Sequence, residues 1–357
     1  MNRITGCRVQ GAGYRKILIV RLDRIGDVLL STPVIKNLRD AYPKSYIAFL
    51  VRPYAREIVQ GNPYLDDVIV YDKAGREKGL RGNLKFIRYL RKKKFDMAII
   101  LHPTKRAHLV AFLAGIPVRV GYDRKWGILL TKRIPHTKQS GLKHEIDYTL
   151  DILRYIGVEP EDRTLYMPVD TACETRVRGM MGDAGITDTD FCIAINPGAS
   201  CPSKRWKTMN FARAADSLAK TYNAKILIIS SEEDRMFAGE VAALMSRPHV
   251  NLAGKTGIGD VASVLRRVKL FVSNDSGPVH IAVAVGTPVI SIFGRSDRGL
   301  SPERWGPSGK RDVALHKDAG CGACLAHNCR RGFRCLDAIT VDDVLAAAAK
   351  ILESRTN

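Results

Sequence analysis

The first candidate for chemistry is a short charged segment near the start of the chain. The sequence VRLDRIGDVLLSTP, residues 20–33, follows an apolar run and precedes a helix-like pattern. Its charged side chains are Arg21, Asp23, Arg24 and Asp27. A turn from a strand to a helix can be built from uncharged residues. The charge therefore predicts a place where something is bound or reacted.

A second segment, PGASCPSKRWK at residues 197–207, combines small residues with a lysine. Gly198, Ala199 and Ser200 allow backbone N–H groups to approach a phosphate closely. Lys204 follows them and supplies a flexible positive charge suited to an anion. A surface loop with ordinary lysines explains the same residues equally well, so this segment alone leaves both interpretations open.

A third segment, DSGPVHIAVAVGTP at residues 275–288, has the features of an anion site at a helix start. Asp275 and Ser276 lie where a helix N-cap belongs, and Gly277 lets a ligand come close. The helix that follows would point its first N–H groups at the loop, and His280 lies in its first turn. Helix capping explains Asp275 but not the tight Ser-Gly-Pro sequence.

The elements that must position these residues alternate along the chain. Short runs rich in Ile and Val, without polar alternation, predict buried parallel strands at residues 17–20, 46–51, 68–71, 97–101 and 119–122. Helical patterns occupy residues 28–41, 80–94 and 104–113. The first half is therefore predicted to be a doubly wound α/β domain.

The same alternation of strands and helices begins again after a polar link at residues 167–172. Strands are predicted at 191–196, 224–230, 269–275 and 287–294, and helices at 209–222, 235–245, 258–268 and 280–285. We expect two Rossmann-like domains, residues 1–170 and 171–339, facing across a cleft, with ligands at the carboxyl ends of the strands. A last helix is predicted at about residues 340–357 with Thr340 as its N-cap.

Composition restricts the class of protein. A chain of 357 residues is longer than one hydrophobic core usually supports. The net charge of +21 favours anionic partners, and the basic residues are densest at residues 76–94. That segment is either a packed helix with a solvated basic face or a surface that rests on an anionic membrane. No nucleic-acid-binding module is visible and aromatic residues make up only 7% of the chain, so we expect no nucleic-acid partner.

Targeting signals are not visible in the sequence. The first residues lack the apolar core of a signal peptide, and the longest uncharged stretch, residues 281–294, is too short to span a bilayer. We therefore expect a cytoplasmic protein.

Four cysteines form a late cluster with the spacing C-x₂-C-x₄-C-x₅-C, namely Cys321, Cys324, Cys329 and Cys335. In a cytosolic protein, this spacing predicts either a closed structural zinc site or packed thiols. His316 and His327 are alternative ligands. A catalytic metal is not expected, because four thiolates leave no open coordination position.

Three motifs together make the sequence resemble a known family. The motifs RLDRIGDVLLSTPVIKNLRDAYP, NPGASCPSKRWK and NDSGPVHIAVAVGTPVISIFG, in this order, are similar to those of the ADP-heptose:lipopolysaccharide heptosyltransferases, glycosyltransferase family 9. The resemblance extends from Lys16 onward and is greatest to the heptosyltransferase II subgroup. It implies a GT-B fold, in which the first domain binds the acceptor, the second binds the nucleotide sugar, and the C-terminal helix packs back on the first.

The resemblance also implies the reaction. The expected enzyme moves L-glycero-D-manno-heptose from ADP-heptose to the inner core of lipopolysaccharide, with inversion and without a cofactor. The acceptor is a phosphorylated glycolipid at the inner face of the cytoplasmic membrane, so contact with an anionic membrane surface is expected too.

On the acceptor side, Asp27 matches the family's catalytic aspartate, the general base that takes a proton from the acceptor hydroxyl. Capping alone would not require Gly26 or the flanking arginines, which favours catalysis over a capping role. Asp23 is the competing candidate for the base. Arg21 and Arg24 are expected to bind the phosphate or carboxylate of the acceptor.

On the donor side, Lys204 would pair with the diphosphate and stabilise the charge that develops on departing ADP. Ser276 and Gly277 would cradle the same phosphates, while Asp275 would contact the heptose or orient its loop. Glu232 resembles the acid that holds the adenosine ribose. The full predicted set for the nucleotide sugar is Ser200, Lys204, Glu232, Asp275, Ser276, Gly277 and His280.

Two enzymatic alternatives keep the same fold. One is transfer of a different sugar, such as a hexose or an N-acetylhexosamine, because the motifs specify the diphosphate and the base better than the sugar. The other is a GT-B-like epimerase acting on a nucleotide sugar. An epimerase would keep the donor residues but would not need Asp27, so that aspartate argues against it.

Overall fold

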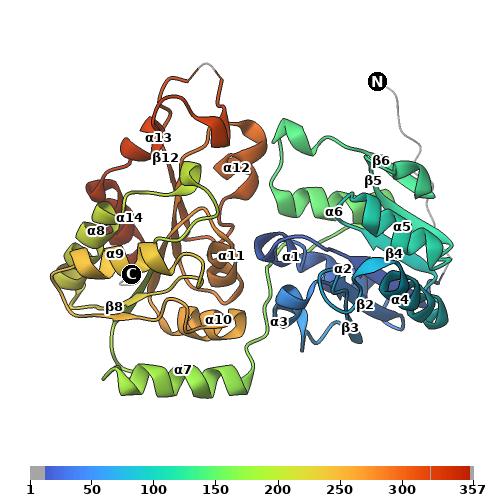
Figure 1. The fold of residues 1–357 in the computed structure, drawn as a ribbon, viewed down its shortest axis with the longest axis horizontal. Coiled ribbons are helices and arrows are strands. Elements are labelled where there is room, and N and C mark those ends of the chain that lie inside the picture. The colour runs from blue at the N-terminus through green and yellow to red at the C-terminus, as the bar shows by residue number, and fades with distance from the viewer. Residues whose placement is uncertain (1–12, 322, 354–357) are drawn as a thin grey trace. The chain divides into compact units, whose positions relative to one another are not determined.

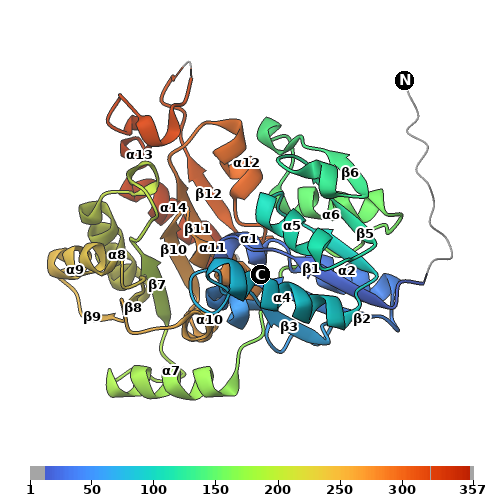
Figure 2. The same ribbon diagram turned by 45° about the vertical axis from the view of Figure 1, so that its right-hand side comes forward.

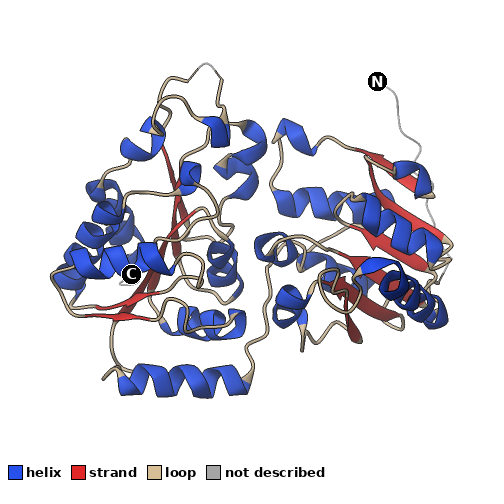
Figure 3. Cartoon of the chain, in the orientation of Figure 1, coloured by secondary structure: helices blue, strands red, loops and turns tan. Residues whose placement is uncertain are grey.

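The computed structural model describes residues 13–321 and 323–353, and these fall into two compact units. Unit 1 comprises residues up to 139 and 145–168, and unit 2 comprises residues 140–144 and those from 169 onward. The chain passes from one unit to the other between Pro168 and Val169, two residues before the predicted boundary. Each unit contains one six-stranded sheet with helices around it (Figures 1 and 3).

The sheet of unit 1 is entirely parallel. Its strands are β1 (Lys16–Val20), β2 (Tyr46–Val51), β3 (Asp67–Val70), β4 (Met97–Ile100), β5 (Val118–Asp123) and β6 (Lys132–Pro135). They lie in the order β3-β2-β1-β4-β5-β6. The connected helices are α1 (Ile25–Leu29), α2 (Pro33–Ala41), α3 (Arg56–Val59), α4 (Gly79–Lys93), α5 (Lys105–Leu113) and α6 (Glu145–Tyr155), with 3₁₀ turns η1 (Pro53–Ala55), η2 (Gly127–Leu129) and η3 (Lys138–Ser140).

Unit 2 repeats this topology. Its strands are β7 (Cys192–Asn196), β8 (Lys225–Ile228), β9 (His249–Asn251), β10 (Leu270–Asn274), β11 (Val289–Phe293) and β12 (Val313–His316). They form a parallel sheet in the order β12-β11-β10-β7-β8-β9. The helices are α7 (Thr171–Asp183), α8 (Thr208–Tyr222), α9 (Arg235–Leu244), α10 (Ile258–Arg267), α11 (Gly277–Ala284), α12 (Pro302–Trp305), α13 (Arg334–Asp337) and α14 (Val341–Glu353), with η4 (Pro202–Lys204), η5 (Arg298–Leu300) and η6 (Ala326–Asn328).

The strand order of each sheet fixes where a ligand can bind. In both sheets the direction of winding reverses at the centre, between β1 and β4 in unit 1 and between β7 and β10 in unit 2. The loops after two such strands leave in opposite directions and open a crevice at their carboxyl ends, where ligands bind in this class of sheet. The segment that begins at Arg21 follows β1, and the loops carrying Lys204 and Asp275 follow β7 and β10. The three motifs therefore lie at the two switch points.

Two differences from the predicted elements have simple causes. The predicted helix at 28–41 is divided into α1 and α2, because Pro33 has no backbone N–H to continue the first helix and instead occupies the first turn of the second. The strands β6, β9 and β12 were not predicted. They lie at or next to a sheet edge and are only partly buried, so their sequences lack the continuous apolar run of a central strand.

The last helix begins as predicted but packs elsewhere. The backbone N–H of Asp343 donates to Thr340 Oγ1 at 3.2 Å, and the N–H of Thr340 donates to Asp343 Oδ2 at 2.7 Å, so Thr340 caps α14. The expectation that this helix returns to the first domain is wrong. It lies beside α8 (Figures 1 and 2), and its apolar face, including Val344, Ala348 and Ile351, completes the core of unit 2.

No helix within residues 13–321 and 323–353 is both long and apolar enough to cross a membrane.

Candidate active site

The acceptor-side segment is built on the end of β1. This strand is buried after its first residue, and the backbone N–H of Arg21, directly after it, still donates to Leu50 O of β2 at 3.1 Å. The chain then turns into α1, whose N-cap is Arg24. Asp27 lies in the first turn of α1, and its carboxylate accepts from a side chain, the guanidinium of Arg21, at 2.8 Å. Asp27 is therefore not the helix cap.

Arg21 is the centre of the acceptor-side cluster. Its Nε donates to Asp23 Oδ1 at 2.8 Å and its second terminal nitrogen donates to Asp27 Oδ1 at 2.8 Å. The same nitrogen lies 3.3 Å from Glu145 Oε1, and the other nitrogen lies 3.4 Å from Leu101 O. The side chain is only 1% exposed. The prediction that Arg21 contacts the acceptor is therefore wrong in this structure, because its guanidinium is enclosed by carboxylates of the protein itself.

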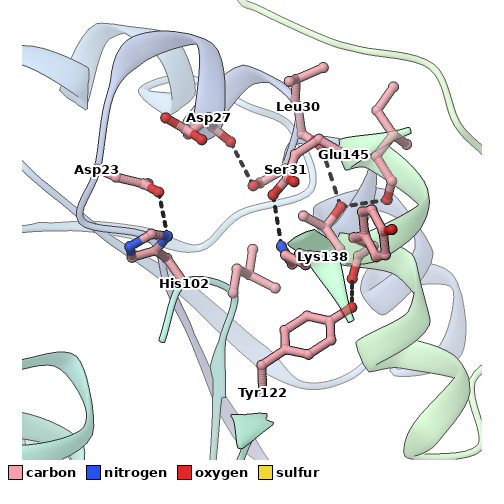
Figure 4. Close-up of polar contacts among 12 residues, drawn as sticks. Asp23, Asp27, Leu30, Ser31, His102, Tyr122, Lys138 and Glu145 are labelled. Atoms are coloured by element: carbon pink, nitrogen blue, oxygen red, sulfur yellow. Dashed lines mark hydrogen bonds and ion pairs between the residues drawn. The ribbon is translucent and has the colours of Figure 1, made fainter. Parts of the chain in front are cut away.

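Three further residues complete the cluster, and sequence reasoning missed all of them. His102 follows β4, and its Nδ1 lies 3.0 Å from Asp23 Oδ2 (Figure 4). Glu145 begins α6 and accepts from Lys138 Nζ at 2.7 Å. The position of His102 at the carboxyl end of a central strand was a usable signal. Nothing local in the sequence links residues 138–145 to residue 21.

The two aspartates of the segment differ in acidity. Burial raises the pKa of Asp27 above the ordinary value, and the negative charge of Asp23 raises it further. Burial also raises the pKa of Asp23, but the positive charge of Arg21 and the hydrogen bond from His102 outweigh it and leave that pKa below the ordinary value. Of the two, Asp27 is the better proton acceptor, since a base is more effective as its pKa approaches the working pH.

Arg24 has a different environment from Arg21. It is the N-cap residue of α1 and lies three residues before Asp27 in the sequence. Its side chain is exposed. Its side chain is therefore accessible to an anionic group in solution, and the prediction that it binds the acceptor stays a prediction.

The donor-side loops are held by two asparagines at the ends of β7 and β10. Asn274 donates to Pro197 O at 2.8 Å and accepts from the backbone N–H of Trp206 at 3.0 Å. Asn196 donates to the hydroxyls of Ser273 and Ser276 at 3.2 and 3.1 Å. These bonds fix the loop after β7 against the start of α11.

Two cations converge on one carboxylate in this region. Lys204 Nζ lies 2.9 Å from Asp275 Oδ2, and Arg295, which follows β11, donates to the same oxygen at 2.7 Å. All three side chains are buried or nearly so. Two positive charges against one negative charge leave a surplus that favours an added anion. Arg295 was missed by the sequence analysis, although it too follows a central strand.

The helix start after Asp275 differs slightly from the prediction. Ser276 is the N-cap of α11, and Gly277 is its first residue. His280 is buried in the first turn, and burial, followed by the charge of His144, lowers its pKa to about 3. His280 is therefore neutral at physiological pH. It contributes a hydrogen-bonding ring beside the site and no positive charge.

The remaining predicted donor residues are exposed. Ser200 lies in the loop after β7 and Glu232 in the loop after β8. The carboxylate of Glu232 is 3.4 Å from Arg235 and lies over Gly254, where an added Cβ would come 2.0 Å from Oε2. The structure thus puts the predicted donor residues on the loops after three adjacent strands, β8, β7 and β10.

The late cysteines are free thiols, and no three His, Cys, Asp or Glu residues of the described chain are arranged as a metal site. The Cys335 thiol donates to Gly294 O, and the N–H of Arg331 donates to Cys329 Sγ at 3.4 Å. The segment also contacts η4, where Ser203 Oγ lies 3.3 Å from His327 Nδ1. It therefore supports the loop of Lys204, while the zinc site stays a prediction.

The sequence matches one protein family over most of its length. Residues 83–333 match the model of glycosyltransferase family 9, whose description reads heptosyltransferase. Lipopolysaccharide heptosyltransferase 3 of Escherichia coli is 27% identical over 335 residues, covering 92% of this chain and 95% of that protein. Lipopolysaccharide heptosyltransferase 2 of Escherichia coli is 25% identical over 298 residues, covering 80% and 85%.

Solved structures agree with this family in fold. A glycosyl transferase family 9 protein from Veillonella parvula superposes with a TM-score of 0.86 at 27% identity, covering 95% of this chain and 98% of that one. The ADP-heptose lipopolysaccharide heptosyltransferase II of Escherichia coli superposes with a TM-score of 0.78 at 22% identity, covering 96% and 100%. The expected GT-B fold is confirmed.

Proposed function

Because the chain belongs to glycosyltransferase family 9 and is a glycosyltransferase, we propose that it transfers L-glycero-D-manno-heptose from ADP-heptose to the inner core of lipopolysaccharide. The names of its heptosyltransferase 2 and 3 relatives support a lipopolysaccharide acceptor and a nucleotide-activated heptose. The two kinds of relative are nearly equally similar, so the proposal names the inner core and no particular hydroxyl.

The observation that carries the proposal is the Asp27 carboxylate. It has a raised pKa, lies at the switch point of unit 1 and is fixed through Oδ1 by Arg21. In the proposed step, Asp27 takes the proton of the acceptor hydroxyl as the hydroxyl oxygen bonds to the anomeric carbon of heptose. The bond from that carbon to the diphosphate breaks, ADP leaves with the electron pair, and the configuration inverts.

The donor side of the proposal assigns the diphosphate to unit 2. Lys204 and Arg295 supply positive charge, and the backbone N–H groups at Ser276 and Gly277 add hydrogen bonds at the start of α11. Glu232 would hold the ribose from its exposed position after β8. Because protein cations stabilise the leaving ADP, the proposed transfer requires no cofactor, and any zinc on the late cysteines is structural.

The test is release of ADP from ADP-heptose by the full-length protein, with and without a heptose-deficient lipopolysaccharide acceptor. We expect release that depends on the acceptor and is lost in Asp27→Asn while ADP binding is kept. ADP-glucose serves as the control donor for the alternative with a different sugar. Release from ADP-glucose and not from ADP-heptose would keep the fold and the base but reject heptose.

A chelator tests the cofactor part separately. Transfer that survives EDTA is expected. Transfer that stops with EDTA and returns with a divalent cation would contradict the assignment of charge stabilisation to Lys204 and Arg295.

We further propose that the protein works at the inner face of the cytoplasmic membrane, where α4 supplies the contact. This helix buries Phe86 and Leu90 in unit 1, and Leu80 is 77% exposed beside its basic side chains. The exposed cations of the helix are Arg81, Lys85, Arg88, Arg91 and Lys92. An exposed leucine next to several cations suits an anionic membrane surface.

A further inference from the structure

We propose that Arg21, held in turn by Glu145 and Lys138, is a positioning residue that fixes the Asp27 carboxylate for proton transfer. This inference rests on the proposed function, in which Asp27 is the base. It assigns a role to Glu145 and Lys138, which no motif of the sequence singled out.

Arg21 holds one oxygen of the Asp27 carboxylate, Oδ1. The guanidinium of Arg21 is planar, so the bond from Nε to Asp23 sets the direction of the bond from the terminal nitrogen to Asp27 Oδ1. A lysine at this position would supply the charge without that fixed direction. Asp27 Oδ2 has no part in these bonds and remains for the proton of the acceptor.

Arg21 is itself fixed from a distant part of the chain. Glu145 is 1% exposed and accepts from Arg21 at 3.3 Å and from Lys138 at 2.7 Å. Lys138 is also buried, with its ammonium 4.9 Å from the ring centre of Tyr122. Figure 4 shows Lys138 and Glu145 in the same region as Asp23 and Asp27, although they come from η3 and α6. A buried ion pair of this kind holds its geometry, because separating the charges leaves one of them unpaired.

Among the ion pairs of Arg21 and Lys138 described above, carboxylates outnumber cations. Three carboxylates, Asp23, Asp27 and Glu145, face two cations, Arg21 and Lys138. His102 beside Asp23 adds a positive charge only when protonated. Because like charges that lie close together repel, the carboxylate with the fewest cationic partners takes up a proton most easily. Asp27 is paired with Arg21, whereas Asp23 has Arg21 and His102 beside it and Glu145 has Arg21 and Lys138.

The ionisable groups that act on Asp27 come from four parts of unit 1. Arg21 and Asp23 belong to its own segment. Tyr54 lies in η1, and the charges of Asp27 and Arg24 both act on it. His102 follows β4. Glu145 on α6, which is paired with Lys138, acts on Asp27 as well. Arg21 and His102 lower the pKa of Asp27, and Asp23 and Glu145 raise it.

The directions in which these groups shift the pKa of Asp27 give a test, because a purely structural role of Arg21 would not predict opposite shifts in two variants. In a plot of kcat against pH, the acid limb is the rise of kcat that follows ionisation of the base. Arg21→Gln removes a cation and so raises the pKa of Asp27, which should move the acid limb to higher pH. At neutral pH kcat should fall about 10- to 100-fold, because the carboxylate is no longer held in position. Glu145→Gln removes an anion but keeps the hydrogen-bond acceptor, so the acid limb should move to lower pH. Arg21→Lys should lower kcat while moving the limb less than Arg21→Gln does.

Arg39→Gln is the matched control. Arg39 also lies in unit 1 and bonds Tyr64 O, Pro43 O, Ser45 O and Asp66, but it does not touch Asp27. This variant should lower the unfolding midpoint and keep the acid limb of the wild type. An acid limb that moves in the same direction in Arg21→Gln and Glu145→Gln, or in neither, would overturn the proposal.

A second readout separates this inference from the proposed function. The pKa of Asp27 is followed by carbon-13 NMR of labelled aspartate carboxyls in the full-length protein, with the resonance assigned by its loss in Asp27→Asn. The order expected is Glu145→Gln lowest, wild type in the middle and Arg21→Gln highest. Wild-type protein that shows this order but releases no ADP would reject the heptosyl transfer and leave the positioning by Arg21 standing. An equal pKa in all three proteins would reject the positioning even if transfer is observed.

Discussion

Asp23 and Asp27 share one guanidinium and yet are suited to different tasks. Asp23 is held by Arg21 and His102, which keep its pKa below the ordinary value, so it serves to orient the cluster. Asp27 has only Oδ1 bonded to Arg21 and a raised pKa, so it can exchange a proton during turnover. The two side chains are about equally exposed, so the difference arises from their charged neighbours: Arg21 and His102 lower the pKa of Asp23, whereas the charges of Asp23 and Glu145 raise that of Asp27.

Replacement of each aspartate should therefore have a distinct effect. Asp27→Asn should lower kcat by about 10²- to 10⁴-fold, because the proton acceptor is lost. Asp23→Asn should keep part of kcat and move the acid limb to lower pH, since the negative charge of Asp23 raises the pKa of Asp27 and the base must be ionised to act. A pH–rate profile from pH 4 to pH 9 on each variant measures this. An acid limb that moves to higher pH in Asp23→Asn would contradict the assignment.

Lys204 provides the corresponding prediction for the donor side. Lys204→Ala should lower kcat by about 10²- to 10³-fold, because charge on departing ADP loses its nearest cation. Lys207→Ala is the control: it is three residues away and pairs with Asp337 at the surface, so its kcat should stay near that of the wild type. Steady-state release of ADP measures both variants. Equal losses in the two would show that the loop, and not the charge, matters.

Single residues could be predicted from the sequence where a motif surrounds them, as for Asp27, Lys204 and Ser276. The partners of these residues could not. Glu145 is 124 positions from Arg21 and Arg295 is 20 positions from Asp275, and only the folded sheet brings each pair together. For the same reason Arg21 was predicted to bind substrate, since its burial is invisible in the local sequence.

At the scale of elements, the central strands were predicted well because burial on both faces gives them continuous apolar runs. Examples are β1 and β10, which are buried almost throughout. The strand β12 has only partly buried and exposed residues, so its sequence resembles a loop. Helix α4 was predicted from its helical pattern, but the pattern did not show which apolar residues pack: Leu80 and Leu84 are exposed, and Phe86 and Leu90 form the contact.

That exposed face of α4 gives a prediction about membranes. Binding of the full-length protein to vesicles containing anionic phospholipid should weaken steeply between about 50 and 500 mM salt, since surface charges are screened within about 10 Å at 0.1 M. Replacing Lys85, Arg88 and Lys92 by Gln together should weaken binding at low salt. The control replaces Lys350 of α14, in unit 2, by Gln and should bind like the wild type. Cosedimentation that does not respond to salt would argue against an electrostatic contact.

At the scale of the whole molecule, each unit has its own sheet and its own core. A ligand of unit 2 should therefore protect unit 2 alone. We expect ADP to slow amide hydrogen exchange in the loops after β7, β8 and β10 and to leave the segment after β1 unchanged, because ligand binding stabilises the unit that holds the ligand. Hydrogen-exchange mass spectrometry measures this. Protection confined to unit 1 would contradict the assignment of the nucleotide to unit 2.

The position of α14 also bears on how the protein is made. All of unit 1 lies before Val169, so its sheet can close while the ribosome is still producing unit 2. Unit 2 needs Val344, Ala348 and Ile351 to fill its core, and these residues emerge after all six of its strands. At about 5–20 residues per second, unit 2 waits on the order of ten seconds or more with an incomplete core after unit 1 is finished. A helix packed on unit 1 would have reversed this order of completion.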